Sequence, residues 1–582
     1  MIQGKNRRLA NVKTRRETGL EYVMFNLDLN TPFGKKKLKE IKPFYPGEEA
    51  ELREELDRVE TMVNFVKQNK TLTDKIQEVF MEVKDVTLTV ERSGDNILST
   101  VELFDIKSLL LQMRQLIKLT EEHEIGDYKG SHCAAECREA EGSSEEEIIV
   151  EVDESVPAVD RVPEEYFLED TEDLLDALDP RGDRLNTFYI YDEFSPQLGV
   201  YRKKKRECEL KIRKEQKQAR EDLRKNHGVM LTPKFDIVVS KSHNDYEKIL
   251  SLEELEIVDQ DYMSTTFQLK PTEAVHEYVK EIEQINTEIE IEEERIREFL
   301  SKSISKKADV ILANCDKIGA LDLSLARAIY AIKHKLIKPE IADEHIIDFE
   351  DGRNIQVEDI LKSKGKEFCP ITIRLDDGVT LITGANMGGK TISLKLAGQI
   401  PMLAQYGFFV PAKKAKIGLS NYVQILIGDS QSVERGLSSF GSEMEELKEI
   451  LDNGQDRSLI LIDEIASGTN PTEGTALTKS LVDYLIQKPY ISLITTHFES
   501  VTEREGVVNM QVRGLCDCNF NLLNSEIRNA KRRDRINIIS KYMDYRLCRV
   551  ENEAQVPKDA LNIASMLGID RVIIDKAKEY IR

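Results

Sequence analysis

The sequence predicts a multidomain chain with an α/β domain of the phosphate-loop type in its C-terminal part. The remainder is predicted to be mostly α-helical, with a long coiled-coil helix pair and a small β region. Three observations lead to this fold class. A Gly-rich loop at residues 383–391 stands between an apolar strand and a helical pattern. Residues 275–299 repeat apolar side chains at alternating three- and four-residue steps. Residues 235–239 and 265–269 alternate as strands do.

The Gly-rich loop has the spacing of a phosphate-binding loop. From Thr383 to Thr391 it reads Thr-Gly-Ala-Asn-Met-Gly-Gly-Lys-Thr, which contains G-x-x-x-x-G-K-[ST]. The apolar run 379–382 predicts a buried strand, and residues 392–405 have helical spacing. Glycines let backbone N–H groups turn toward phosphates, and the helix N-terminus adds its positive dipole end. We therefore expect Lys390 to reach β- and γ-phosphates and the Thr391 hydroxyl to bind Mg²⁺.

Two further apolar strands end in polar residues. Residues 458–464 end in Asp463 and Glu464. A carboxylate there suits the Mg²⁺ shell, and a second one can orient and deprotonate an attacking water. Residues 491–497 end in His497, which we expect to contact the γ-phosphate from the neighbouring strand. A histidine at a strand end is usually structural, and the two preceding motifs are what favour a catalytic one.

Two segments beside these strands carry a family resemblance. Residues 428–440 lie between the loop and the acidic strand, and residues 466–474 follow the acidic pair. With Asn-Met inside the loop and Asp-Glu-x-x-x-Gly-Thr-x-Pro-x-Glu-Gly from Asp463, the chain resembles the MutS family, whose ATPases share the ABC-type composite site. Ala466 departs from a glycine common at that position. The departure can alter the flexibility of the loop but removes no catalytic group.

The resemblance extends beyond these segments, over roughly residues 20–125 and 180–582. Residues 31–34, Thr-Pro-Phe-Gly, look like the start of the family's core domain. Residues 321–326 look like the return into that core, and residues 560–569 look like the C-terminal helix pair.

The most similar branch of the family lacks the N-terminal mismatch-reading domain. That reader needs a Phe-x-Glu in a domain before the core, and only a short segment precedes residue 31. The Phe-x-Glu at residues 167–169 lies in an acidic stretch, and we interpret it as coincidence. We recognise no nuclease domain after the helix pair.

The resemblance implies an ATP hydrolase of the ABC-type P-loop class that uses ATP and Mg²⁺. In such enzymes a signature serine acts on the γ-phosphate bound by the opposite subunit, so the chain is expected to form a homodimer through its ATPase domain. An aromatic residue before the first ATPase strand stacks on adenine in this family, although Phe368 is alternatively an ordinary core residue. The expected catalytic residues are Glu464, His497 and Lys390, the expected metal ligands are Thr391 and Asp463, and the expected nucleotide contacts are Phe368, Gly384, Ala385, Asn386, Met387, Gly388, Gly389, Lys390, Thr391, Ile392, Ser438 and Ser439.

The resemblance and the charge pattern together predict four segments. They are a first part of the core at 1–125, an acidic insertion or linker at 126–182, the rest of the core with lever helices and a clamp (about 228–270) at 183–335, and a MutS-type ATPase domain with the C-terminal helix pair at 336–582.

The acidic segment is the most unusual in composition. From Glu136 to Asp179 the chain holds 18 acidic and 2 basic residues, a local charge of −16. A solvated linker is one interpretation, and a surface for a basic partner or a guard against nucleic acid is the other. Within it we expect at most a short strand at 148–152 and a helix at 170–178.

The segment from Tyr201 to Lys225 has the opposite charge, with 12 basic and 5 acidic residues, a net +7. It is either a lever helix that contacts nucleic-acid phosphates or a solvated amphipathic helix. We expect it to pair with a returning helix, through a coiled-coil seam or through ordinary helix burial. Glu292 is the polar break in that seam, whose apolar members are Val275, Tyr278, Ile282, Ile285, Ile289, Ile296 and Phe299.

Composition sets the remaining bounds. The chain has 582 residues and a formal net charge of −23. It has no apolar run of about 18 residues, so no membrane span or membrane partner is expected. Eight cysteines without regular spacing, and a basic start without an apolar region, predict a cytoplasmic protein.

Two functions follow from the resemblance. The first is a dimeric DNA-binding clamp ATPase that recognises a DNA structure and not a mismatch, although mismatch repair is the family's general activity. The second is an ATP-driven remodelling or reactivating factor for a partner enzyme, such as a cobalamin-dependent aminomutase. The acidic insertion and the low pI favour the second, because negative surfaces repel nucleic acid. A heterodimer with a related chain stays open.

Overall fold

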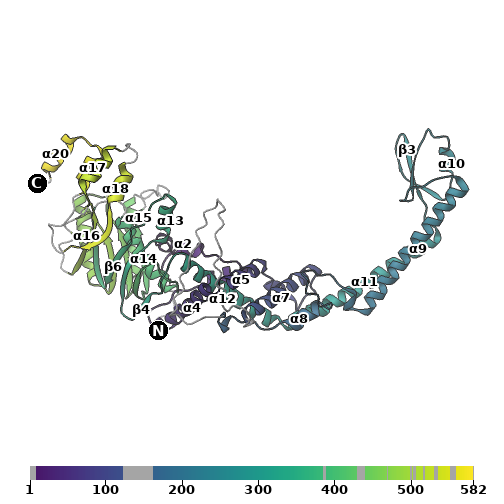
Figure 1. Cartoon of the computed structure of the whole chain (residues 1–582), viewed down its shortest axis with the longest axis horizontal. Helices are drawn as coiled ribbons and strands as arrows, with labels where there is room; N and C mark the ends of the chain where they lie inside the picture. The colour runs from purple at the N-terminus through teal and green to yellow at the C-terminus, as the bar shows by residue number, and fades with distance from the viewer. Residues whose placement is uncertain are drawn as a thin grey trace, which may run out of the picture. The chain divides into compact units, whose positions relative to one another are not determined.

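The computed structural model describes residues 8–121, 161–384, 389–428, 439–467, 469–498, 501, 506–515, 518–529, 535–550 and 559–580 (Figure 1). It is a mixed α/β structure with three sheets in that part of the chain. Residues 1–77, 125–166 and 318–582 form one compact unit, and residues 78–124 and 167–317 form the other. Within the described ranges, no helix combines the length and the apolar character needed to cross a membrane.

The first unit contains a six-stranded sheet in the order β13-β12-β7-β11-β10-β9. Its strands are β7 (Gly378–Thr383), β9 (Tyr422–Ile427), β10 (Ser458–Asp463), β11 (Tyr490–Thr495), β12 (Val507–Gly514) and β13 (Asp544–Arg549). All neighbours pair parallel except β13, which is antiparallel to β12. Every residue of β10 and β11 is buried, which confirms the strands expected from the apolar runs, because parallel strands covered on both faces read as continuous apolar stretches.

A second sheet of four strands belongs to the same unit, in the order β4-β8-β5-β6. Its strands are β4 (Glu340–Ala342), β5 (Ile346–Gly352), β6 (Ile371–Asp376) and β8 (Lys414–Gly418). Helix α14 (Gly389–Gln405) packs against strands of both sheets. Its 14 buried residues therefore cover nearly its whole circumference.

The other helices of this unit are α1 (Val12–Glu17), α2 (Leu20–Phe25), α3 (Pro32–Glu40), α4 (Glu49–Gln68), α13 (Ile355–Ser363), α15 (Ser439–Asn453), α16 (Pro471–Ile486), α17 (Phe520–Asn529), α18 (Arg535–Tyr542), α19 (Asp559–Leu567) and α20 (Arg571–Tyr580), with a 3₁₀ turn η1 (Glu164–Tyr166). Helices α19 and α20 are the helix pair expected after residue 560. Helices α5 (Lys70–Glu82) and α12 (Ala308–Lys333) run from one unit into the other.

Two segments far apart in the sequence meet in this unit. Asp322 accepts hydrogen bonds from the Thr31 backbone N–H at 2.8 Å and from Thr31 Oγ1 at 2.7 Å. Thr31 Oγ1 in turn accepts the Gly34 N–H and caps α3. A Cβ at Gly34 would lie 2.2 Å from Asp322 Oδ2, so only glycine fits there. Burial raises the pKa of Asp322, and the three N–H and O–H donors at Asn30 and Thr31 partly offset this rise.

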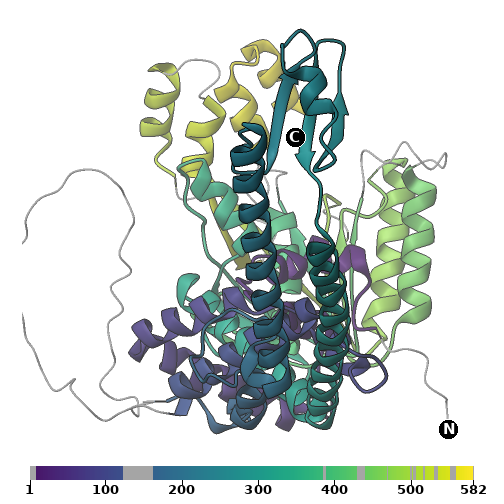
Figure 2. The ribbon, with the colours of Figure 1, turned by 90° about the vertical axis from the view of Figure 1, so that its right-hand side faces the viewer.

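The second unit is dominated by two long helices, α9 (Pro196–His227) and α11 (Glu273–Lys306). They lie side by side (Figure 2). This pairing confirms that the basic segment 201–225 packs against the returning helix. Most predicted seam positions are buried or half-buried in α11; they are Val275, Tyr278, Ile282, Ile285, Ile289 and Ile296.

The prediction for Phe299 is wrong. Its side chain is 64% exposed, whereas its neighbour Leu300 is fully buried. A strict 3.5-residue repeat places position 299 in the seam. An α-helix has about 3.6 residues per turn, so the buried face shifts along the helix relative to that repeat and position 300 lies inward instead. Glu292, the polar break, is held by Ser195 Oγ, which donates to Glu292 Oε1 at 2.6 Å.

The third sheet lies at the far end of α9 and α11 and has the order β1-β3-β2 (Figure 2). Its strands are β1 (Asp236–Ser240), β2 (Leu255–Gln260) and β3 (Ser264–Leu269), with a short helix α10 (Tyr246–Leu250) between β1 and β2. β1 and β3 are the two strands expected from alternation, and they pair antiparallel. Phe267 and Val239 are buried in a small core of their own beneath this sheet.

Part of the predicted acidic insertion is folded into the second unit. Helix α8 (Glu172–Leu178) confirms the helix expected at 170–178, and its three leucines are buried. It packs against α7 (Thr100–Glu121) and α11, so a solvated linker is the wrong description for residues 172–178. The expected strand at 148–152 lies outside the described residues. The remaining elements of this unit are α6 (Thr87–Arg92) and the 3₁₀ turn η2 (Asp192–Phe194).

Candidate nucleotide site

The candidate site lies where β7, β10 and β11 end. These strands are parallel and adjacent in the order β7-β11-β10, so their carboxyl ends meet at one edge of the sheet. Gly384 follows β7 with φ 123°, a backbone conformation open to glycine alone. Helix α14 begins at Gly389, so Lys390 and Thr391 stand in its first turn. The loop residues Ala385, Asn386, Met387 and Gly388 lie outside the described part of the chain.

Lys390, Glu464 and His497 form one cluster at this edge. Lys390 Nζ lies 3.0 Å from Glu464 Oε1 and 3.2 Å from His497 Nδ1. His497 Nε2 lies 2.8 Å from the same Glu464 oxygen. Because Lys390 has only donors, a neutral His497 accepts at Nδ1 and donates from Nε2–H to Glu464. The Lys390 side chain is 3% exposed, whereas Glu464 and His497 are 23% and 40% exposed, so the cluster opens to solvent on the carboxylate and imidazole side.

The electrostatics of Glu464 are set by these neighbours. Partial burial alone would raise the pKa of Glu464, but the hydrogen bond and charge of Lys390, with a smaller contribution from His497, outweigh it and hold the pKa below its ordinary value. The backbone of Glu464 has φ 49°, in the left-handed region, and its N–H donates to Thr495 O at 3.1 Å and to Thr495 Oγ1 at 3.0 Å. The carboxylate is therefore ionised at neutral pH and held by both backbone and side chain.

Thr391 and Asp463 meet beside this cluster. Thr391 Oγ1 donates to Asp463 Oδ2 at 2.8 Å, and Thr495 Oγ1 donates to Asp463 Oδ1 at 2.5 Å. A hydroxyl and a carboxylate from two neighbouring elements are the oxygen ligands that Mg²⁺ takes together with phosphate oxygens and water. The donor set at this point thus fits a magnesium ion.

The loop after Glu464 adds a further carboxylate. Ala466 has φ 59° and is fully buried, and its N–H donates to Glu443 Oε1 of α15 at 3.3 Å. Burial raises the pKa of Glu443, which Ala466 N–H partly offsets. The departure from glycine seen in the sequence therefore places an L-residue in a conformation that costs it roughly 1–2 kcal/mol.

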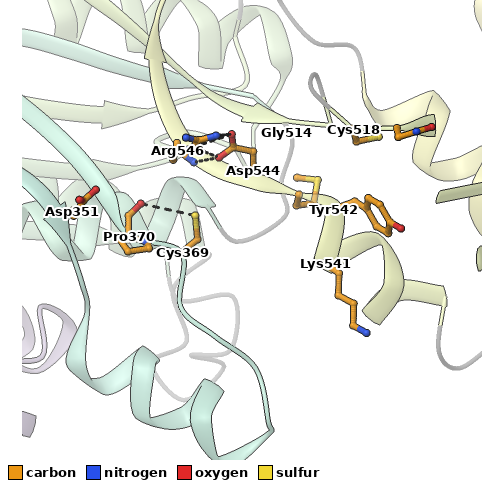
Figure 3. A pocket seen from close by; sticks show the side chains of 11 residues that line it. Asp351, Cys369, Pro370, Gly514, Cys518, Lys541, Tyr542, Asp544 and Arg546 are labelled. Atoms are coloured by element: carbon orange, nitrogen blue, oxygen red, sulfur yellow. Dashed lines mark hydrogen bonds and ion pairs between the residues drawn. The ribbon is translucent and has the colours of Figure 1, made fainter. Parts of the chain in front are cut away.

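The other expected nucleotide contacts are less completely placed. Phe368 is half-buried and precedes Cys369, which lines an open cavity of about 590 Å³. Figure 3 shows Cys369 around this cavity together with Tyr542 and Asp544, which come from the end of α18 and the start of β13. Ile392 lies in the first turn of α14, and Ser439 is the first residue of α15. Ser438 lies outside the described residues.

Thr495 is a site residue that sequence reasoning missed. It stands opposite Asp463 in the parallel register and bonds both Asp463 and Glu464. A polar signal was present, because Thr495 and Thr496 close an otherwise apolar strand just before His497. That signal is weak, because the β-branched side chain of threonine also fits any strand position.

Comparison with known proteins finds relatives for the part of the chain that holds this candidate site. Residues 380–581 match the family model MutS domain V. The chain is similar to proteins named Endonuclease MutS2 from Shouchella clausii (32% identical over 294 residues), Fusobacterium nucleatum (33% over 300 residues) and Clostridium botulinum (34% over 261 residues). These matches cover 49%, 50% and 44% of this chain but 33%, 35% and 32% of the relatives. The chain thus spans about one third of the length of the curated relatives it matches.

Proposed function

Through its domain V this chain belongs with the MutS-family proteins, and from that premise we propose that it is an Mg²⁺-dependent ATP hydrolase of the ABC-type P-loop class. The single observation that supports this most is the convergence of Lys390, Thr391, Asp463, Glu464 and His497 at the ends of three adjacent parallel strands. These five side chains supply a cation for phosphates, two metal-ligand oxygens, a base and a polar sensor.

In this proposal ATP places its phosphates at the N-terminus of α14, where the helix dipole and Lys390 favour negative charge. Lys390 then exchanges Glu464 for the β- and γ-phosphates. Thr391 and Asp463 would hold a Mg²⁺ ion, which would supply charge stabilisation to the phosphates. Glu464, released from Lys390, orients the attacking water and takes its proton, and His497 contacts the γ-phosphate.

The test is the substitution Glu464→Ala. We expect ATP binding to persist and steady-state turnover to fall by about 10²-fold or more, because that is the scale of losing a general base. Glu445→Ala, an exposed carboxylate on α15, is the matched control and should hydrolyse ATP like the wild type. Wild-type turnover in Glu464→Ala, or no nucleotide affinity in the wild type, contradicts the proposal.

We further propose that the enzyme works as a homodimer. Ser438 and Ser439 would act across the interface on the partner's γ-phosphate, so one chain alone binds ATP but hydrolyses it poorly. Turnover per chain should then rise with protein concentration through the dimerisation range. Constant turnover per chain in samples shown to be monomeric would rule this out.

We propose that this ATPase binds DNA. The net charge of +7 from Tyr201 to Lys225 lies on α9, and Lys203 and Lys204 are exposed. We propose α9 and α11 as levers and residues 228–270 as the clamp. Lys203→Glu/Lys204→Glu/Lys205→Glu should abolish a gel shift with duplex or branched DNA, because phosphate contacts dominate such binding. The control Lys35→Glu/Lys36→Glu/Lys39→Glu changes the charge equally, at exposed positions of α3.

A protein client is the second candidate, and one observation favours it. Residues 228–270 hold 8 acidic and 4 basic residues, a net charge of −4, which repels phosphates at the proposed clamp. The β2–β3 turn presents Tyr262, 97% exposed, and Met263, 74% exposed. Asp261 fixes this turn by accepting the Met263 and Ser264 N–H groups at 2.6 Å. Two results would favour a protein client over DNA. One is a gel shift with DNA that the triple substitution on α9 leaves unchanged, and the other is the lack of any gel shift even at low salt.

A further inference from the structure

The N-terminal segment 9–17 contacts three elements of the nucleotide-site unit at once. It includes the short helix α1 and lies in the same compact unit as β9, α14 and α15. None of the proposed catalytic steps uses it. Its contacts nevertheless fall on the elements that flank the two halves of the proposed composite site.

The first set of contacts is with β9, one of the two edge strands of the six-stranded sheet. The Val423 N–H donates to Leu9 O at 2.7 Å, and the Ile425 N–H donates to Thr14 Oγ1 at 3.2 Å. Thr14 Oγ1 itself donates to Gln424 Oε1 at 2.9 Å, and both side chains are buried. The segment thus satisfies the outward N–H groups that an edge strand otherwise leaves open.

The second contact involves Lys13. Its Nζ lies 2.7 Å and 2.8 Å from the two carboxylate oxygens of Glu446 on α15, and 3.5 Å from the carbonyl oxygen of Ile427. Ile427 is the last residue of β9, and α15 begins at Ser439. Lys13 therefore contacts the residue that precedes the segment 428–440, which the family resemblance identifies as the signature, and the helix α15 in which that segment ends.

The third contact is with α14, the helix that begins at the proposed phosphate-binding loop. Lys395 Nζ lies 2.9 Å from Glu17 Oε2. One turn further, a Cβ at Gly398 would lie 2.6 Å from Thr18 Cγ2, so glycine lets the chain approach α14 this closely. The segment is consequently fixed on α14 at Glu17, on α15 at Lys13 and on β9 at Leu9 and Thr14.

We propose that residues 9–17 are a brace that positions the signature segment relative to the nucleotide loop, with Lys13–Glu446 as its adjustable contact. This inference rests on the proposed ATPase function. The signature serines must meet a γ-phosphate bound by the other subunit, and misplacement by about 1 Å at such a site costs on the order of 10²-fold in rate. Lys13 is a positioning residue here, because it touches neither nucleotide nor a reacting atom.

A simple edge seal is the alternative role for the same contacts. A seal affects stability and aggregation alone, whereas a brace affects turnover at unchanged nucleotide affinity. The Lys13–Glu446 pair separates the two roles, because its side chains are 30% and 24% exposed and do not take part in the hydrogen bonds that Leu9 and Thr14 make with β9.

The experiment uses the full-length chain with Lys13→Glu, Glu446→Lys and the double exchange. We expect each single variant to lower kcat about three- to tenfold, with the Kd for ATP unchanged, because the ion pair becomes a like-charge pair. The double exchange should recover kcat to within about twofold, because it restores the attraction. Lys448→Glu, the same charge change at an exposed position on α15, should match the wild type.

Hydrogen exchange provides a readout that does not depend on turnover. The backbone amides of residues 439–450 should exchange faster in both single variants and regain protection in the double exchange. Unchanged kcat and exchange in the single variants, or a double exchange as impaired as they are, overturns the brace. If the wild type hydrolyses no ATP, the proposed function fails, and the exchange pattern alone decides whether the brace exists.

Discussion

Two clusters in this molecule each pair a lysine with a carboxylate and have opposite characters. In the second unit, Lys107 and Asp179 are both fully buried, with Lys107 Nζ 3.5 Å from Asp179 Oδ1 and 3.0 Å from Thr187 O. In the first unit, Lys390 is buried but its partner Glu464 is 23% exposed.

The difference lies in what can replace a partner. Lys107 meets only groups of its own fold, so losing one leaves an unpaired buried charge. Lys390 is buried as well, but its partner Glu464 is partly exposed, and in the proposed mechanism a phosphate takes the place of Glu464 beside Lys390. If that proposal holds, the same pair of chemical groups favours structure in one place and exchange in the other.

The largest effect on stability is expected from breaking the buried pair Lys107–Asp179. Lys107→Met should destabilise the second unit by about 3 kcal/mol, because it removes the cation beside Asp179 Oδ1 and leaves the buried carboxylate only Arg184, whose Nη1 lies 3.6 Å from Oδ2. The shift of the urea unfolding transition, followed by circular dichroism, measures this. The double variant Lys107→Met/Asp179→Leu should recover most of the loss. Lys84→Met, at an exposed pair with Asp105, is the control. If Lys107→Met lowers the free energy of unfolding by less than about 1 kcal/mol, the buried pair is no more important for stability than the exposed one, and the contrast between the two clusters is wrong.

The matching substitution at the partly exposed cluster of Lys390, Glu464 and His497 should affect the binding of ATP and not the stability of the fold. Lys390→Met is expected to weaken ATP binding about 10- to 100-fold, the scale of losing charge-assisted hydrogen bonds to phosphate. The unfolding midpoint should move little, because Glu464 keeps His497 and solvent. Calorimetric titration with a non-hydrolysable ATP analogue measures the affinity, and Lys479→Met on α16 is the control. Unfolding comparable to that of Lys107→Met would contradict the comparison.

The structure explains how far the sequence alone could go. The site residues converge as the motifs predict, because parallel strands end at a common edge, and their nucleotide roles stay predictions. The sequence did not predict that Lys390 and Glu464 contact each other, since this depends on side-chain conformations at strand ends. Phe299 was misplaced because an ideal repeat ignores the drift of a real helix. The contacts of Lys13 join positions 433 residues apart and leave no local pattern.

A third prediction uses pH. The pKa of Glu464 lies below the ordinary 4.5, so its ionised form stabilises the folded state. That contribution is complete above the unfolded-state pKa and is lost as the pH falls through the lowered folded value. The stability difference between wild type and Glu464→Gln should therefore shrink from pH 6 toward pH 3. We expect less than about 1 kcal/mol in total, because the carboxylate is partly solvated. A difference that grows toward acid pH would reverse the assignment.

The smallest effect is expected at Ala466. Replacing it by glycine relieves about 1–2 kcal/mol of left-handed strain but loses a buried methyl, worth about 0.8 kcal/mol, and costs about 0.5–1 kcal/mol of chain entropy. The free energy of unfolding of Ala466→Gly should thus lie within about 0.5 kcal/mol of the wild-type value. Ala476→Gly in helix α16, where no strain is relieved, should lose about 1 kcal/mol. Equal losses in the two variants, measured by thermal unfolding, would show that Ala466 is unstrained.

The hydrogen bonds between Leu9, Thr14 and strand β9 bear on how this protein can be cut into fragments. A fragment that starts at residue 336 would keep every strand of the six-stranded sheet. It would lose the residues that hydrogen-bond to the outer side of β9, which would then be exposed. Bare strand margins recruit other chains. Such a fragment should precipitate or form oligomers unless residues 8–25 are supplied, either fused or as a separate peptide.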